Sequence, residues 1–371
     1  MIKRVLVLLL LLSSLFARSA PGDEELKKGR DLLYSARFEE AEKCFLKAQS
    51  AAPGSVAPGF FLAAGKLGEI TYRGEDEMSL SNLELRVAAC CELSLKAKDG
   101  EDGKFFLYSG ASFLLRASLE ARAERYAEAL FWAKKALLRF QRAAAFPECA
   151  SDALMLQSAY DHVLNRAPWP VNLSLDWIVR SAGEQNDLAL LEENLSPKSE
   201  FEKELRIFLI SEYCGLGYPR LAMAHLKELQ KSLKDSPFLE IIAIRTEMSS
   251  GNMRGAYSSA TNLYAKSFSK KIYRPLRADA AFLTGSAAFA LGNIRGAEGF
   301  FERALKEGES KPRVQAVCML MLGKCADARG DREEALRRYA LVHIHKGASV
   351  FVKNLTSKLQ RSPGDLSQTI Y

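Results

Sequence analysis

Residues 285–304, GSAAFALGNIRGAEGFFERA, carry the sequence pattern from which the fold of this chain is predicted. They predict one antiparallel helix pair, with a turn at Gly292 between the two helices. In the second helix Ala297, Phe301 and Ala304 stand at i, i+4 and i+7, which places them on one side of an α-helix. A single pair cannot bury such a stripe alone, so the segment predicts neighbouring pairs of the same build.

The turn and the stripe recur in one six-residue frame. The frame stands at residues 36–41, 124–129, 217–222, 251–256, 292–297 and 330–335. Each copy ends in alanine, and the residues four and seven positions later continue the stripe. Twelve positions before that alanine, three copies carry Gly29, Gly285 or Gly323, where a small residue lets the two helices approach closely.

This frame resembles the tetratricopeptide repeat, a helix–turn–helix unit of about 34 residues. The first copy matches best: Gly29, Ala41, Phe45 and Ala48 are followed by Pro53, where that family commonly ends its second helix. The resemblance covers about residues 23–53, 104–145 and 200–345. It implies an all-α fold, a right-handed superhelical solenoid of antiparallel helix pairs. The layout also looks like that of exported bacterial proteins containing this repeat.

Other parts of the chain depart from the frame. Residues 58–72 and 80–98 predict a helix pair without the small residues of the frame. Residues 149–198 predict an irregular helical hairpin or linker, because Pro168 and Pro170 must interrupt a helix. The expected order is a leader (1–19), N-terminal repeats (20–148), the irregular hairpin (149–198), C-terminal repeats (199–346), a capping helix (347–361) and a flexible tail (362–371).

Residues 1–19 predict a secretory signal peptide. Lys3 and Arg4 precede an apolar run over residues 5–16, and small residues lead to a cleavage site after Ser19. A retained anchor is the alternative, but twelve helical residues span ~18 Å, against ~30 Å for the hydrocarbon core. The sequence therefore predicts an exported protein, periplasmic or secreted. It would have no membrane span after cleavage, which leaves peripheral association with the cell envelope open.

Charge and cysteine content narrow the class further. The full chain carries a net charge of +7, and loss of three basic residues with the leader leaves 49 basic and 45 acidic residues, a net charge of +4. A charge this small does not favour nucleic acid as a partner. The seven cysteines stand mostly in apolar stripes, so we interpret them as buried packing residues. A disulfide from Cys90 or Cys91 to another helix pair stays open.

The sequence carries no recognisable pattern for catalysis. GxSxG, Walker A, GxGxxG and HExxH patterns are absent, as is a cluster of Cys and His at zinc spacing. The four His are dispersed, and His343 and His345 would not face each other on a helix. We therefore expect a non-enzymatic protein without a cofactor or metal. An enzyme that uses residues 149–198 is the least favoured hypothesis.

The resemblance implies a partner-binding groove. In that family ligands lie in a concave groove lined by the first helix of each pair. Here the residues expected to contact a partner are Arg245, Asp279, Phe282, Ser286, Lys324 and Asp327. Such a surface suits a peptide or helical segment, with the cations pairing with a carboxylate. The alternative is that the apolar row is core between helices and the polar row is solvated.

Residues 266–277 form a second candidate surface. The segment has two aromatic residues, no acid and five cations: Lys266, Lys270, Lys271, Arg274 and Arg277. It suits an anionic polysaccharide or a lipid headgroup, as in an accessory protein of envelope or exopolysaccharide assembly. The alternative is that residues 266–277 are only a solvated loop between two helix pairs. The leading hypothesis is a non-enzymatic protein–protein interaction scaffold of the cell envelope or periplasm.

Overall fold

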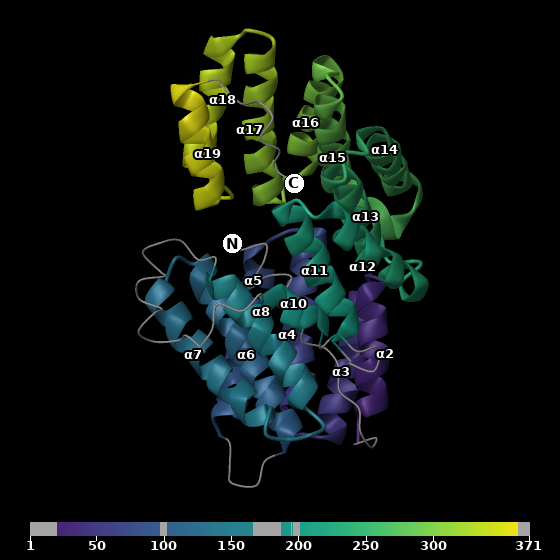
Figure 1. The fold of residues 1–371 in the computed structure, drawn as a ribbon, viewed down its shortest axis with the longest axis vertical. Helices are drawn as coiled ribbons and strands as arrows, with labels where there is room; N and C mark the ends of the chain where they lie inside the picture. Colours follow the sequence, from purple (N-terminus) through teal and green to yellow (C-terminus); the bar gives the residue numbers. More distant parts are fainter. Residues whose placement is uncertain (1–20, 97–101, 166–186, 194, 196–200, 363–371) are drawn as a thin grey trace. The chain divides into compact units, whose positions relative to one another are not determined.

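The computed structural model describes residues 21–96, 102–165, 187–193, 195 and 201–362. Within these residues the regular structure is helical and contains no strand, which confirms the predicted all-α class (Figure 1). The predicted leader, the break at Pro168 and Pro170 and the tail after Ser362 lie outside the described residues. No described helix is both long and apolar enough to cross a membrane.

The described residues form seventeen α-helices and one short 3-10 helix, η1. They are α2 (Asp23–Tyr34), α3 (Phe38–Ala51), α4 (Val56–Arg73), α5 (Glu77–Leu95), α6 (Gly103–Arg122), α7 (Tyr126–Ala143), α8 (Ala150–Asn165), α10 (Asp187–Glu193), α11 (Glu202–Leu216), α12 (Pro219–Ser232), α13 (Pro237–Ser249), α14 (Met253–Ser269), η1 (Lys271–Leu276), α15 (Arg277–Ala290), α16 (Ile294–Glu307), α17 (Pro312–Ala328), α18 (Arg332–Ile344) and α19 (Val350–Arg361).

The chain divides into two compact units, which we describe separately. The first unit comprises Met1–Gly68, Met78–Tyr213 and Ala224–Ser232, and the second comprises Glu69–Glu77, Cys214–Met223 and Leu233–Tyr371. The division falls within α4, α11 and α12. In both units, helices that follow each other along the chain pack against one another.

In the first unit, the pair α2–α3 closes around Gly29. A Cβ added at Gly29 would lie 2.3 Å from the Phe45 ring, so only glycine permits this approach. Phe45 in turn stacks on Phe61 of α4, with ring centroids 5.3 Å apart. Phe61 meets Tyr108 of α6 edge-on at 5.7 Å. The glycine therefore brings α2 against an aromatic core that continues into the next pair.

In the second unit, α15–α16 and α17–α18 are built in the same way. A Cβ at Gly285 would lie 2.9 Å from the Phe301 ring, and one at Gly323 would lie 2.3 Å from the Tyr339 ring. Both rings are buried. Figure 1 shows α15 to α19 following one another from green to yellow, and the packing contacts of these helices agree with that order. Both glycines therefore lie where the two helices of a pair approach closely, as the sequence predicted for small residues twelve positions before the alanine of the frame.

The turn inside each pair begins with a residue in the left-handed region. Gly217, Gly251, Gly292 and Gly330 have φ between 78° and 80°. In the first unit Ala36 and Glu124 occupy the same place, with φ of 55° and 61°. The backbone of the frame is therefore alike in both units, although only the second unit uses the residue that adopts it without strain.

The C-terminal helix α19 packs against α17 and α18. Val352, Leu355 and Leu359 join a buried cluster that includes Tyr339 and Val342. At the other end of α19, Arg332 Nη2 donates to the carbonyl oxygens of Leu359 and Gln360 at 2.8 and 2.6 Å. Helix α19 lies within the segment for which the sequence predicts a cap, residues 347–361.

All seven cysteines are free, so the disulfide left open at Cys90 or Cys91 is not formed. Six of them are buried, and Cys214 is partly buried. Cys90 Sγ lies 2.8 Å from Ser112 Oγ inside the first unit. Burial raises the pKa of both Cys90 and Cys91 to about 12, which keeps these thiols protonated near neutral pH. The interpretation of the cysteines as packing residues is confirmed.

Candidate functional site

Three of the six predicted groove residues lie in the interior of the second unit. Phe282 and Ser286 are buried on α15, and Ser286 Oγ donates to the Phe282 carbonyl oxygen at 2.9 Å. Lys324 of α17 is only 1% exposed, and its ammonium group lies 5.5 Å from the centroid of the Phe289 ring. In this conformation these side chains are not open to a partner.

The two predicted acidic contacts, Asp279 and Asp327, both have internal partners. Asp279 Oδ2 accepts from Lys311 Nζ at 2.5 Å, which joins the start of α15 to the start of α17. Asp327 accepts from Arg332 at 2.9 and 3.0 Å and from the Tyr339 hydroxyl at 2.8 Å. These contacts bind helices of the same unit to one another.

Arg245 of α13 differs from the other charged groove residues. It is partly buried, yet it forms no hydrogen bond or ion pair with any residue that the structure describes. Its pKa is lowered, chiefly because burial disfavours the charged form, while the nearby Asp279 opposes that shift. Asp279 is already held by Lys311. The guanidinium group of Arg245 is therefore a partly desolvated cation that lacks an anion of its own.

Two of the five cations in the basic segment 266–277 are neutralised inside the unit. Lys266 Nζ donates to Glu240 Oε2 at 2.8 Å, and the Tyr273 hydroxyl donates to the other oxygen of that carboxylate at 2.5 Å. Arg277 pairs with Glu307 at 3.2 Å, and its guanidinium carbon lies 4.1 Å from the centroid of the Phe268 ring. Lys266 and Arg277 therefore join parts of the same unit, and Glu240 and Glu307 balance their charges.

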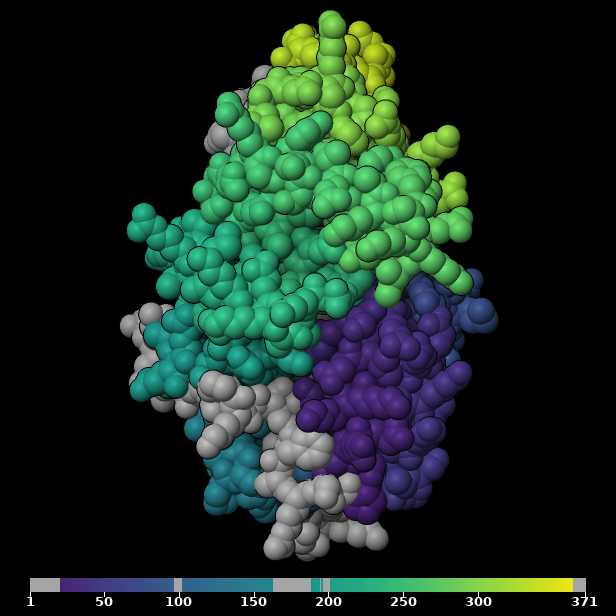
Figure 2. Space-filling view, turned by 90° about the vertical axis from the view of Figure 1, so that its right-hand side faces the viewer, coloured from purple at the N-terminus to yellow at the C-terminus, as the bar shows by residue number. Residues whose placement is uncertain are grey.

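The other three cations, Lys270, Lys271 and Arg274, lie on the surface. All three are exposed, and no described residue forms an ion pair with them. The segment is not a loose loop, because α14 extends to Ser269 and η1 follows directly, with Tyr273 buried. Figure 2 shows long side chains projecting from the green part of the surface, to which α14 and η1 belong. The short helix η1 and the residue before it thus present three exposed cations, of which Lys270 has its ammonium group 5.9 Å from the centroid of the Tyr273 ring.

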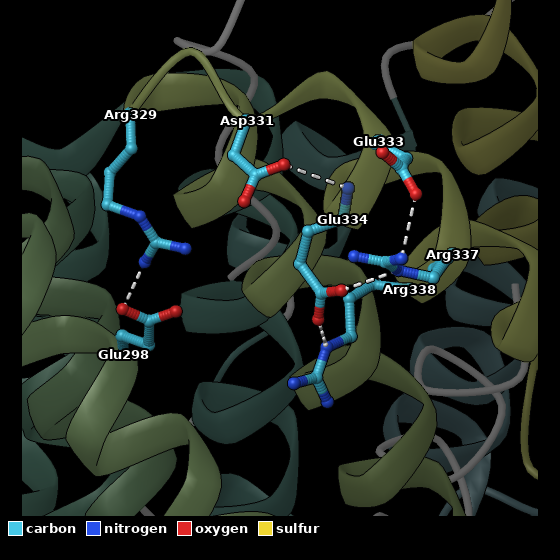
Figure 3. A network of polar contacts seen from close by, with 7 residues as sticks. All are labelled: Glu298, Arg329, Asp331, Glu333, Glu334, Arg337 and Arg338. Carbon is cyan, nitrogen blue, oxygen red and sulfur yellow. Dashed lines mark hydrogen bonds and ion pairs between the residues drawn. The ribbon is translucent and has the colours of Figure 1, made fainter.

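A network of charged residues surrounds the turn between α17 and α18 (Figure 3). Asp331 accepts from the Glu334 backbone N–H at 3.1 Å and caps α18. Glu334 then accepts from both Arg337 and Arg338, at 2.8 and 2.7 Å, and these bonds lower its pKa. Arg329 also pairs with Glu298 of α16. The network organises the start of α18, where acidic side chains of the first turn complement the helix dipole.

The first unit contains a polar cluster that the sequence did not indicate. His225 Nε2 lies 2.8 Å from Glu192 Oε1, and His225 Nδ1 lies 3.3 Å from Arg206 Nη1. The ring stacks on Tyr213, with centroids 5.9 Å apart and planes 8° apart. The pKa of His225 is lowered, chiefly because burial disfavours the imidazolium form. These residues come from α10, α11 and α12, so no spacing rule connects them.

A second buried pair lies between α8 and α11. His162 Nε2 lies 3.0 Å from Glu212 Oε2, and the carboxyl group of Glu212 is inaccessible to solvent. Eight residues earlier on α11, the Glu204 carboxylate accepts a hydrogen bond from the Tyr34 hydroxyl. Partners 50 and 170 positions apart in the sequence cannot be found by periodicity. Among the described residues no group of three or more His, Cys, Asp or Glu could hold a metal ion.

Comparison of the chain with protein-family models gives no match, and comparison with curated proteins gives none either.

Proposed function

We propose that this chain is an exported repeat protein of the tetratricopeptide type and a non-enzymatic scaffold of the cell envelope. The proposal extends to a right-handed superhelical arrangement of the pairs and to removal of residues 1–19 as a signal peptide. Its support is the recurrence of one frame with one turn geometry and one glycine–aromatic contact across pairs. Intact-mass measurement of the protein purified from its host tests the leader, and retention of residues 1–19 would contradict export by cleavage.

The scaffold binds a peptide or helical segment of a protein partner, and Arg245 is the observation that carries this proposal. Burial has removed part of the hydration of its guanidinium group, and Asp279, the carboxylate that acts on its charge, is held by Lys311. A carboxylate brought by a partner would form a charge-assisted, bidentate pair there. Because the other predicted groove residues are buried or internally paired, the contact surface is narrower than the sequence suggests and centres on α13.

Charge reversal at Arg245 tests the site. Arg245→Glu should abolish the capture of specific partners from an envelope extract of the host, measured by quantitative mass spectrometry. Arg254→Glu is the matched control, because Arg254 is an exposed arginine at the start of α14 and the change in net charge is the same. Capture by Arg245→Glu at the wild-type level, with both variants folded by circular dichroism, would exclude the Arg245 site.

A second candidate function rests on Lys270, Lys271 and Arg274. Three exposed cations without acidic partners suit an anionic polymer, as in an accessory protein of envelope or exopolysaccharide assembly. Binding of a polyanion should then disappear with added salt and in Lys270→Gln/Lys271→Gln. Unchanged binding by that variant would exclude this surface.

A further inference from the structure

The turn between α18 and α19 carries the two most exposed large apolar side chains among the second unit's described residues, Ile344 and Phe351. Ile344, the last residue of α18, is 82% exposed, and Val350 and Phe351, the first residues of α19, are 53% and 64% exposed. The five residues between the helices bring the two groups to one end of the pair. A soluble surface carries single apolar residues without consequence, but three around one turn form a patch.

This turn is held in place by its own contacts. A Cβ at Gly347 would lie 2.1 Å from the Pro312 carbonyl carbon, so the turn packs directly on the start of α17. The Gly347 N–H donates to His345 Nδ1 at 3.1 Å, and the Val352 N–H donates to Ser349 Oγ at 3.3 Å. The apolar side chains are therefore displayed on a defined backbone, so little chain entropy would be lost when they are covered.

The charge along α18 after its first turn, and along α19, has one sign. Residues 335–361 contain no Asp and no Glu. Within this segment Arg337 and Arg338 pair with acids at the start of α18, as Figure 3 shows. By contrast, no described residue forms an ion pair with Lys346, Lys353, Lys358 or Arg361. Lys346 lies in the turn itself and Lys353 in the first turn of α19, so the apolar patch has two cations beside it in sequence that form no ion pair with a described residue.

The position of the patch on the last helix is unusual for an end cap. A terminal helix of a repeat array buries one face and presents polar residues outward. Helix α19 buries Val352, Leu355 and Leu359 in this way, yet its first turn presents Val350 and Phe351 to solvent. Solubility alone would favour polar residues at those two positions, so their apolar character indicates that something covers them.

We propose that the α18–α19 turn docks on an anionic lipid surface. Ile344, Val350 and Phe351 enter the boundary between headgroups and acyl chains, and Lys346 and Lys353 meet the anionic headgroups. A strongly exposed turn suits a membrane, because a bilayer accepts a protruding residue without a complementary pocket. This surface is separate from Arg245, so it adds a membrane contact to the proposed scaffold.

A second copy of the chain fits the patch less well. A two-fold interface between identical turns would place Lys346 and Lys353 of one copy against the same cations of the other. Like charges across an interface oppose association, whereas an anionic membrane removes that repulsion. An acidic protein partner would satisfy the charge but needs a surface shaped around three protruding side chains.

Co-sedimentation with vesicles tests the proposal. The mature chain, from residue 20 on, should bind phosphatidylcholine vesicles containing phosphatidylglycerol and should bind vesicles of phosphatidylcholine alone at least about tenfold more weakly. Ile344→Ser/Phe351→Ser and Lys346→Gln/Lys353→Gln should each lower the partition coefficient on the anionic vesicles by about tenfold or more. Unchanged thermal unfolding of both variants would show that the loss is not due to misfolding.

Two control variants match these changes elsewhere on the chain. Met78→Ser/Leu85→Ser removes side chains of α5 that are 82% and 68% exposed, and Lys27→Gln/Lys28→Gln removes two exposed cations of α2. Both controls should bind the anionic vesicles like the wild type. If neither vesicle type binds the chain, or the controls weaken binding as much as the test variants, the proposal is wrong.

Two further outcomes would also overturn it. Concentration-dependent self-association in sedimentation velocity that Phe351→Ser abolishes would identify a second copy as the occupant. Binding of a soluble polyanion that is lost in Lys346→Gln/Lys353→Gln but kept in Ile344→Ser/Phe351→Ser, without vesicle binding, would identify an anionic polymer. Because Arg245 is intact in all these variants, failure here leaves the test of the scaffold function independent.

Discussion

In the first unit, α2–α3 turns at Ala36 and α6–α7 turns at Glu124, whereas α15–α16 of the second unit turns at Gly292. The residue after the turn differs too: Arg37 and Arg125 offer no side-chain cap, but Asn293 Oδ1 accepts from the Gly296 N–H at 3.0 Å. The dihedral angles at these three residues are nevertheless alike, with φ between −82° and −95° and ψ between 63° and 72°.

The identity of the turn residue therefore does not determine the backbone of the frame. Glu124 adopts a left-handed conformation that costs a non-glycine residue roughly 1–2 kcal/mol. That cost is tolerated because the two helices on either side are fixed by packing. The close contact between a small residue and an aromatic ring occurs in both units, at Gly29 with Phe45 and at Gly285 with Phe301. Packing between the two helices therefore determines the geometry of the pair more than the identity of the turn residue does.

The largest expected effect comes from filling the space at those glycines. Gly29→Ala and Gly285→Ala should each destabilise their own unit by about 1–3 kcal/mol, because a new methyl group meets a buried ring that cannot move away. Gly29→Ala should cost more, since its Cβ would lie 2.3 Å from the ring rather than 2.9 Å. Hydrogen exchange of peptides from each unit, followed by mass spectrometry, measures the loss of protection.

Gly299→Ala in α16 is the matched control for these substitutions. A Cβ at Gly299 would meet nothing within 4 Å, so the better helix propensity of alanine should stabilise the second unit by up to about 1 kcal/mol. Equal effects of Gly285→Ala and Gly299→Ala would contradict the dominant role of packing, because they would show that backbone preference and not packing sets the cost.

The caps give the next largest effect. Asn293→Ala should destabilise the second unit by about 1 kcal/mol, because the Gly296 N–H loses its acceptor. The reciprocal change Arg37→Asn in the first unit should stabilise α3 by about 1 kcal/mol or less, since Arg37 already has a suitable backbone conformation. Hydrogen exchange of the backbone amides in the first turns of α16 and α3 measures both changes in stability. A neutral Asn293→Ala would show that the cap adds nothing to a helix start already fixed by packing.

These contacts also show how far sequence reasoning reaches. The frame indicated the pairs, the turns and the close approach of two helices at Gly285, because all are local in sequence and depend on steric size. Lys324 was predicted to face a groove, but a position counted along one helix does not reveal which neighbouring helix covers it. His225, Glu192 and Arg206 meet through three different helices, and no local pattern records such a contact.

The turn residues should give a smaller effect of opposite sign in the two units. Glu124→Gly should stabilise the first unit by about 0.5–1 kcal/mol, because relief of the left-handed strain exceeds the extra entropy of the unfolded chain. Gly292→Ala should destabilise the second unit by about as much. Urea unfolding followed by tryptophan fluorescence reports the first unit, because Trp132 of α7 lies in that unit.

The buried side chain of His225 should make the stability of the first unit depend on pH. Burial lowers the pKa of His225, while Glu192 opposes the shift and Arg206 adds to it; Tyr213 stacks on the same ring. Histidine in the unfolded chain has a pKa of about 6.5. As the pH is lowered, the unfolded chain therefore takes up this proton before the folded chain does. The contribution of His225 to stability is fully present above that pH and is lost as the pH falls below it.

The urea midpoint of the first unit should accordingly fall as the pH is lowered through this range, and His225→Gln should flatten that fall. His345→Gln is the control, because His345 also has a lowered pKa through burial but belongs to the second unit. The control should leave the tryptophan-detected curve of the first unit as it is in the wild type. An equally steep fall in His225→Gln would show that groups other than His225 carry the pH dependence of this unit.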